Sequence, residues 1–324
     1  MGLEAGLRTG ARRSRRILTA GLGVLLAVSG LACSSATSSD PSKPATVPTQ
    51  SQAPWREIFS DQFAGPASSG VDTSKWQYVN GQGMNFFGTG EVETTTSSPS
   101  NIHLDGHGGL DITVLGRGAA GSPGSEWTAA RIKTNTVFKP PLGGELKVTA
   151  SIKQPDPANA LGYWPGFWML GTGQWPTSGE IDILEDVNGL SKVSGTFHCG
   201  NLTQRNPDGS FGPCHEKSGL GSGLQECQGC QTAFHTYSVI VDRRDPQAQQ
   251  IRWYLDGHRY FSVNESQVGQ AAWTQAMDTG YQILLNMAVG GAFPDLQCGC
   301  TTPTDQTSSH GTMVVRDVAA YISG

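Results

Sequence analysis

The chain has 324 residues, with 22 basic and 27 acidic side chains and a formal net charge of −5. Such a balance argues against a nucleic-acid partner, because nucleic-acid binding relies on a basic surface. If the first 32 residues are removed, five Arg and one Glu go with them, and 17 basic and 26 acidic residues remain, a net charge of −9. The residues that remain also show no local cluster of basic side chains that would suit a strongly anionic polymer.

The first 32 residues have the features of an export signal. Five Arg precede an apolar run at 17–28, which is short for a membrane span. Residues 14–18 resemble a twin-arginine signal, and residues 30–33 resemble a bacterial lipoprotein cleavage site. Cys33 is therefore a lipidation candidate that would anchor the protein to a membrane, whereas cleavage after Ala36 would release it. In both cases we expect an exported protein, extracellular or at the cell surface.

Residues 33–54 are rich in Ser, Thr and Pro and predict a disordered linker. The remaining residues, 55–324, predict one all-β domain, because the sequence has 43 Gly and 18 Pro and few helical periods. Short stretches of alternating apolar and polar residues are separated by turn residues, as at 109–114, 144–149, 237–241 and 251–257. This pattern is typical of a β-sandwich or jelly roll, and we expect a monomer.

Residues 179–185 read Gly-Glu-Ile-Asp-Ile-Leu-Glu and predict a half-buried strand. Side chains of a strand repeat every two residues, so Glu180 and Asp182 share a face while Glu185 would point the other way. A β-bulge at Ile183 and Leu184 would bring Glu185 onto the face of Glu180. Paired carboxylates about 5–5.5 Å apart suit a retaining glycosidase. A solvated acidic strand without chemistry is the alternative.

An aromatic segment lies just before this strand, at residues 162–176, and contains Trp164, Trp168 and Trp175. Flat aromatic rings stack on the C–H faces of sugars, so Trp beside paired acids indicates a carbohydrate-binding cleft. We expect two of the three indoles to contact ligand and the third to pack inside. His198 falls on the next predicted strand, which would bring it near the acids as a substrate hydrogen-bond partner.

Six cysteines follow the predicted linker, and an exported chain favours disulfides. They are Cys199, Cys214, Cys227, Cys230, Cys298 and Cys300. Six cysteines allow 15 pairings. We expect Cys199–Cys214 and Cys227–Cys230, since each closes a short loop, with Cys298–Cys300 as a very tight ring.

A zinc site is the rival interpretation of the first four cysteines, together with His198 and His215. An oxidising compartment argues against it, because it removes thiols from the pool of ligands. The surrounding segment, 200–233, is a long polar loop that we expect to wall one end of the cleft.

The acid motif, preceded by Trp-Pro-x-Phe-Trp, resembles glycoside hydrolase family 16, in particular its laminarinase branch, which has the extra bulge residue. The resemblance runs from about residue 55 to residue 321. It implies a jelly roll of two antiparallel sheets with a concave substrate cleft. It also implies that Glu180 is the nucleophile, Glu185 the general acid/base, and Asp182 the neighbour that tunes both.

The resemblance extends to residues outside the motif. It implies a cleft-lining role for Arg131, for which a surface ion pair is the alternative, and a polar cleft position for Glu91. No cofactor is required, although some members bind a structural calcium ion through an Asp at the place of Asp317. An equally simple interpretation of Asp317 is a surface residue, since calcium needs 6–8 oxygen ligands.

Together these features predict a retaining endo-glycosidase that hydrolyses internal β-1,3 linkages of a β-glucan. The substrate follows from the resemblance, because residue spacing does not reveal linkage. The same mechanism on a β-1,3-1,4-glucan or a galactan, or transglycosylation, are alternatives. A non-catalytic carbohydrate-binding protein and a structural wall protein belong to other classes. The intact acid pair argues against the first, and the Trp-rich segment argues against the second.

Overall fold

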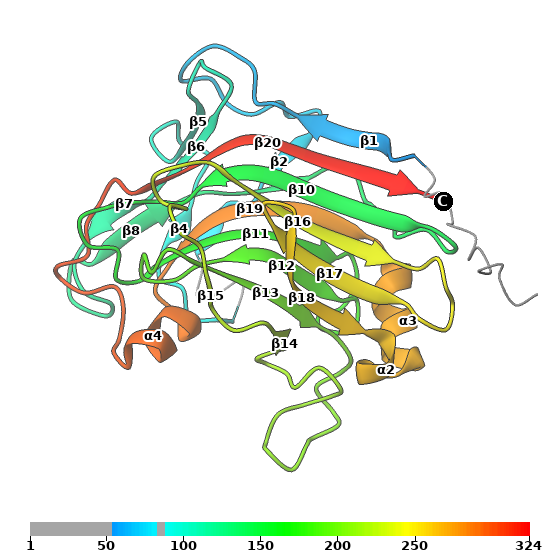
Figure 1. Ribbon diagram of the computed structural model, residues 1–324. Helices are drawn as coiled ribbons and strands as arrows, with labels where there is room; N and C mark the ends of the chain where they lie inside the picture. Colours follow the sequence, from blue (N-terminus) through cyan, green and yellow to red (C-terminus); the bar gives the residue numbers. More distant parts are fainter. Residues whose placement is uncertain (1–53, 83–87) are drawn as a thin grey trace, which may run out of the picture. The chain divides into compact units, whose positions relative to one another are not determined.

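Two antiparallel sheets dominate the structure, a computed structural model that describes residues 54–82 and 88–324 (Figure 1). The expected export signal, Cys33 and nearly all of the linker lie outside the described residues. All described residues belong to one unit of the chain, Ser51–Gly324. None of the helices in this part of the chain has the length and apolar character needed to span a membrane.

The first sheet has the strand order β18-β17-β16-β10-β20-β6-β5, and β1 pairs with β20. Its strands are β18 (His258–Asn264), β17 (Gln250–Leu255), β16 (His235–Asp242), β10 (Glu145–Lys153), β20 (Thr312–Ser323), β6 (Leu110–Thr113), β5 (Ile102–Leu104) and β1 (Arg56–Asp61). β10 alternates buried and part-exposed residues, as the sequence pattern predicts. One face of this sheet therefore packs on the core.

The second sheet has the order β14-β13-β12-β11-β19-β9-β2, and β15 pairs with β13. Its strands are β14 (Leu220–Gly221), β13 (Lys192–His198), β12 (Glu180–Glu185), β11 (Tyr163–Gly171), β19 (Tyr281–Val289), β9 (Arg131–Thr134), β2 (Trp76–Tyr78) and β15 (Gln225–Glu226). β12, which carries the acid motif, lies in the interior of this sheet between β11 and β13. Both of its edges are hydrogen-bonded, so its backbone is held on two sides.

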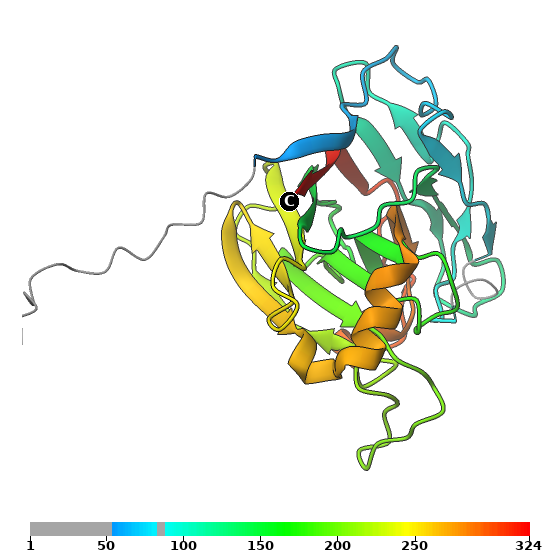
Figure 2. The ribbon, with the colours of Figure 1, turned by 90° about the vertical axis from the view of Figure 1, so that its right-hand side faces the viewer.

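A smaller sheet and three short helices complete the described fold. The sheet contains β3 (Gly81–Gln82), β4 (Thr94–Thr95), β8 (Glu126–Ala129) and β7 (Leu115–Arg117), and the helices are α2 (Glu265–Val268), α3 (Gln270–Thr279) and α4 (Ala292–Cys298). α3 packs beside the second sheet (Figure 2). Its Trp273 contacts Phe197 of β13, with ring centroids 5.9 Å apart.

Apolar side chains from both large sheets form one buried core. Ile181, Ile183 and Leu184 of β12 enter it, and the indole of Trp253 reaches them from β17. Burial of such side chains contributes roughly 1.5–3 kcal/mol each. The two-sheet antiparallel sandwich confirms the predicted jelly-roll class, and it leaves the polar side chains of β12 on the face away from the core.

Candidate active site

A β-bulge in β12 places its three carboxylates on one face. On the β11 side, Phe167 pairs with Leu184 and Trp168 pairs with Asp182, so Ile183 is the extra residue. Ile183 and Leu184 are both at most 1% exposed and turn into the core. Two successive residues facing inward shift the alternation by one, and Glu185 therefore returns to the face of Glu180 and Asp182. The bulge predicted from the sequence is confirmed.

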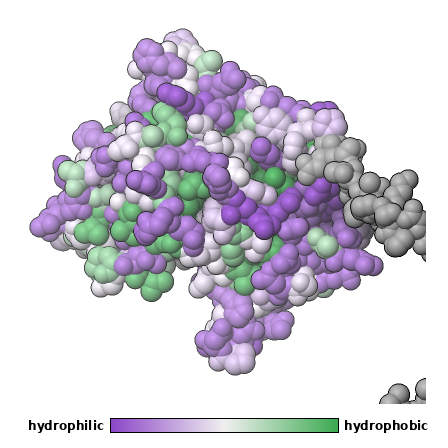
Figure 3. Space-filling view, viewed as in Figure 1, coloured by the Kyte–Doolittle hydropathy of each residue, from purple (hydrophilic) through white to green (hydrophobic). Residues whose placement is uncertain are grey.

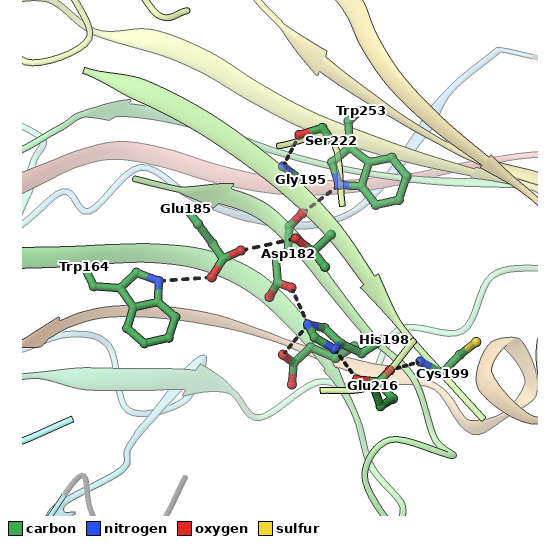
Figure 4. Close-up of polar contacts among 11 residues, drawn as sticks. Trp164, Asp182, Glu185, Gly195, His198, Cys199, Glu216, Ser222 and Trp253 are labelled. Atoms are coloured by element: carbon green, nitrogen blue, oxygen red, sulfur yellow. Dashed lines mark hydrogen bonds and ion pairs between the residues drawn. The ribbon is translucent and has the colours of Figure 1, made fainter. Parts of the chain in front are cut away.

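The opposite sheet supports the backbone of this bulge through two aromatic donors. The indole N–H of Trp253 donates to the carbonyl of Asp182 at 2.6 Å (Figure 4), and the hydroxyl of Tyr260 donates to the carbonyl of Ile183 at 3.5 Å. Gly195 of β13 makes room for the indole, because a Cβ there would lie 2.4 Å from Trp253. No local sequence pattern predicts this support, since the donors lie 71 and 77 positions from the carbonyls that accept their bonds.

Trp253→Phe should destabilise the fold by about 1–3 kcal/mol, because it leaves a buried carbonyl without its donor. Activity should fall as well, since the bulge sets the position of Glu185. Urea unfolding and kcat measure the two effects. Tyr260→Phe is the matched control and should lose less, because its bond is at the limit of hydrogen-bonding distance. A Trp253→Phe variant as stable and active as the native chain would contradict support of the bulge by the indole.

Glu185 has the environment of a general acid. Trp164 donates its indole N–H to Oε1 at 3.0 Å (Figure 4). The hydroxyl of Thr196 donates to Oε2 at 3.4 Å. Burial raises the pKa of Glu185, and the negative charge of Asp182 raises it further, against the opposing effect of His198. A carboxyl group with a raised pKa keeps its proton near neutral pH and can donate it.

His198 lies among the other carboxylates. Its Nε2 is 3.5 Å from Asp182 and 3.8 Å from Glu180, and its Nδ1 is 2.8 Å from Glu216. Burial would lower the pKa of His198, but the hydrogen bond with Glu216, the ion pair with Asp182 and the charge of Glu180 hold it well above its ordinary value. These neighbours favour the protonated, imidazolium form of the ring. The proximity of His198 to the acids was predicted, whereas Glu216 was not.

The surroundings of Glu180 act on its pKa in opposite directions. Burial and the charge of Asp182 raise the pKa of Glu180, and the positive charges of His198 and Arg131 offset only part of this rise. Arg131 is 2% exposed and lies 3.4 Å from Glu91, so this pair is buried rather than a surface ion pair. The two cations near Glu180 thus reduce the cost of forming its carboxylate, the form that a nucleophile needs.

The three predicted indoles all lie at this face and are all partly exposed, so the expectation that one packs inside was wrong. The ring of Trp175 lies 5.7 Å from that of His198. Trp168 donates to the side chain of Asn286 at 2.7 Å, and the guanidinium of Arg131 lies 5.5 Å from its ring centre. Polar anchors fix the indole planes, which leaves their exposed faces available to a ligand.

Glu93 is a buried carboxyl group that the sequence did not single out. Its Oε2 accepts a hydrogen bond from the backbone N–H of Val289 at 2.9 Å, and Oε1 has no hydrogen-bond partner among the described residues. Burial and the neighbouring Glu91 raise the pKa of Glu93 to about 8. Glu93 therefore favours its protonated form in the folded protein.

Glu93→Gln should raise stability at alkaline pH. Between the ordinary pKa of a Glu and about 8, the native state binds a proton that the unfolded state releases, so the stability of the native chain falls as pH rises through this window. Relative to the native chain, the variant should gain about 2–4 kcal/mol between pH 4 and pH 9. Urea unfolding across this range measures the gain. Glu126→Gln, at an exposed position, should show no gain in stability. An equal gain in both variants would contradict the raised pKa of Glu93.

The three expected disulfides are present: Cys199–Cys214, Cys227–Cys230 and Cys298–Cys300. Their sulfurs are covalently paired, so the rival zinc site loses its thiolate ligands. Among the described residues, Cys227, Cys230 and His235 do lie close together, as do Glu180, Asp182 and His198. In the second group, Nε2 of His198 lies 3.8 Å from Glu180 and 3.5 Å from Asp182, so the ring is an ion-pair partner of both acids.

Asp317 lies on β20 of the first sheet, whereas the three carboxylates lie on β12 of the second. It lines a surface hollow of about 460 Å³ together with Glu57, Asp61 and Arg316. The carboxylate of Asp61 already accepts hydrogen bonds from Trp76 and from the backbone of Phe63, which limits what it can offer an ion. Calcium binding at Asp317 stays a prediction.

Comparisons with known proteins agree with this geometry. A family model described as "XgeA-like, catalytic GH16 domain" matches residues 125–238. The crystal structure of an endo-1,3-beta-glucanase from Streptomyces sioyaensis is similar, with a TM-score of 0.73 and 38% identity, over 88% of this chain and 99% of that one.

Two curated relatives match about three quarters of the chain. A glucan endo-1,3-beta-glucosidase A1 of Niallia circulans is 30% identical over 73% of this chain and 34% of its own length. The clotting factor G alpha subunit of Tachypleus tridentatus is 29% identical over 74% of this chain and 31% of its own length. The chain thus spans about a third of each of these two relatives.

Proposed function

The chain belongs to glycoside hydrolase family 16, and we propose that it is a retaining endo-glycosidase that hydrolyses internal β-1,3 linkages of a β-glucan. One observation carries the proposal: the bulge in β12 sets three carboxylates on one face of the sheet, with Glu185 hydrogen-bonded to Trp164 and Glu180 beside His198. The family supplies the reaction class. The 38% identity to an endo-1,3-beta-glucanase supports the substrate.

In the first step, the carboxylate of Glu180 attacks the anomeric carbon while the bond from that carbon to the leaving oxygen breaks. Glu185 gives its proton to the leaving oxygen. Glu180 becomes a neutral glycosyl ester, so its repulsion of Glu185 disappears and Glu185, now ionised, becomes the base. It takes a proton from water, the water oxygen attacks the anomeric carbon, and Glu180 is released. Two inversions leave the product in the β configuration.

The remaining residues of the face bind and orient the glucan. Trp164, Trp168 and Trp175 offer partly exposed rings for stacking on sugar faces. His198 and Arg131 supply positive charge to Glu180, which opposes the cost of burying its anion. We propose that glucan lies along this face in an open cleft, which suits cleavage within a polymer. No cofactor takes part.

Export is part of the proposal. Three disulfides within the catalytic domain suit an oxidising compartment. We propose that residues 1–32 direct export, that Cys33 is the site of lipidation, and that residues 33–54 tether the enzyme at the cell surface as a monomer.

Product analysis on laminarin, mixed-linkage glucan, agarose and arabinogalactan tests the substrate. Short oligosaccharides from laminarin alone are the expected result. Cleavage of only another polymer would keep the mechanism and replace the substrate. Binding of these polymers without cleavage would overturn the enzyme in favour of a carbohydrate-binding protein.

A further inference from the structure

A loop that follows β13 folds back over His198. It covers residues 199–219 and projects from the second sheet (Figure 1), and hydrophilic residues gather on its tip (Figure 3). Near the end of this loop, the side chain of Glu216 returns to the sheet and is 1% exposed. Its Oε2 lies 2.8 Å from Nδ1 of His198, and its Oε1 accepts a hydrogen bond from the backbone N–H of Cys199 at 2.9 Å (Figure 4).

The backbone around Glu216 is fixed on several sides. Glu216 exchanges two backbone hydrogen bonds with Phe211, of 2.7 and 2.8 Å. The Cys199–Cys214 disulfide joins the start of the loop to a point two residues before Glu216. Gly219 has a φ of +70° and passes so close to the imidazole that a Cβ there would lie 2.9 Å from Cε1 of His198. Hydrogen bonds, the disulfide and the close approach of Gly219 thus hold the loop against the imidazole ring.

Charged groups face His198 from each element around it. Glu180, Asp182 and Glu185 face it from β12, and Glu216 faces it from the loop. On the far side of Glu180, Arg131 of β9 is the other cation that acts on this carboxylate. An imidazolium in this place has a hydrogen-bond acceptor for Nδ1–H in Glu216, and its Nε2 lies within ion-pair distance of Asp182 and Glu180.

We propose that Glu216 is a positioning residue of the active site, which accepts Nδ1–H of His198 and so holds the ring as an imidazolium with Nε2–H directed at Asp182 and Glu180. The role in catalysis rests on the proposed function, whereas the effect on His198 does not. A charged ring opposes the repulsion between Glu180 and Asp182. It also fixes both carboxylates relative to β13, since Glu216 holds the ring through Nδ1.

A purely structural role for Glu216 is the competing account, in which it only ties down the loop through Cys199. Glu216→Gln separates the two accounts. The amide oxygen can still accept from the N–H of Cys199, so the loop contact is kept, but the negative charge beside Nδ1 is lost. The amide NH2 then faces Nδ1 of His198, and because it donates a hydrogen bond instead of accepting one, it favours the neutral ring.

The test is an NMR titration of the ring nitrogens of His198 in the free protein, together with the pH profile of hydrolysis. In the native protein both nitrogens should carry protons at pH 7. In Glu216→Gln the ring should lose its proton at lower pH, and activity should fall as pH rises through that point. We expect kcat to drop roughly tenfold, with a smaller change in KM, because Glu216 is buried away from the substrate.

Asp208→Asn is the matched control. It makes the same carboxylate-to-amide change on the same loop, where Asp208 is exposed and pairs with His215 at 3.1 Å. In this variant, the titration of His198 and the rate of hydrolysis should match those of the native protein. A neutral His198 in the native protein would overturn the proposal even if Glu216→Gln did not fold. An unchanged titration in Glu216→Gln, or a shifted titration with unchanged kcat and pH profile, would also overturn it. Failure to cleave any polymer would refute the proposed function instead and leave the titration result standing.

Discussion

Glu180→Gln should lower kcat on laminarin by on the order of 10⁴-fold or more, with oligosaccharide binding retained. The amide has the shape of the carboxyl group but cannot form the glycosyl ester. His198 lies 3.8 Å from Glu180 and stays paired with Glu216, so the rest of the site should keep its arrangement. Kinetics on laminarin and calorimetry with a laminarin oligosaccharide measure the two properties.

Glu93→Gln is the matched control for this variant. It is the same substitution at another buried carboxyl group, one that bonds to the backbone of β19. We expect its hydrolysis rate to stay near that of the native chain. Near-native hydrolysis by Glu180→Gln would remove Glu180 as the nucleophile. Mass spectrometry of a trapped intermediate gives an independent check, since the sugar should be found on the peptide that contains Glu180.

The central acids of the site could be predicted, because the residues that place them lie close together in the sequence. Glu180, Asp182 and Glu185 lie within one strand, and the Ile183–Leu184 pair breaks the alternation in a way that only a bulge can accommodate without exposing an apolar side chain. The disulfides were predictable for the same reason, since each joins cysteines close in sequence. The class of the fold followed from the short alternating strands, which both sheets contain.

The support of the site could not be predicted, because it comes from distant parts of the chain. Trp253 and Tyr260 reach the bulge from the opposite sheet, and no local pattern distinguishes a core Trp that donates a hydrogen bond from one that does not. Glu216 lies in a polar loop among many polar residues. Only the closure of the loop onto β13 sets it apart.

Partial exposure of all three predicted indoles has a related cause. From the sequence alone, Trp164, Trp168 and Trp175 could not be told apart, because all three lie in one aromatic segment. In the structure each indole has its own neighbour: Glu185, Asn286 and the ring of His198. These polar neighbours lie at the face of the sheet, so the indoles stay there instead of entering the core.

Glu185→Ala should lower hydrolysis of laminarin by roughly 10²–10⁴-fold, the usual contribution of a general acid. A glycoside with an activated aryl leaving group should still form the glycosyl ester, because such a leaving group needs no proton. The ester should then accumulate, since the base for the second step is also missing. A burst of released aryl alcohol followed by slow turnover is the signature, and stopped-flow absorbance measures it.

The pH profile adds a test with a definite sign. Burial and the charge of Asp182 raise the pKa of Glu185, so native kcat/KM should stay high through neutral pH and fall on the alkaline side as Glu185 loses its proton. Trp164→Phe should move this alkaline limb to higher pH, because the indole hydrogen bond lowers the pKa of Glu185. In Glu185→Ala the limb should be absent for release of the activated leaving group. An alkaline limb that persists in that variant would assign the acid to another residue, and Asp182 would then be the carboxyl group to replace next.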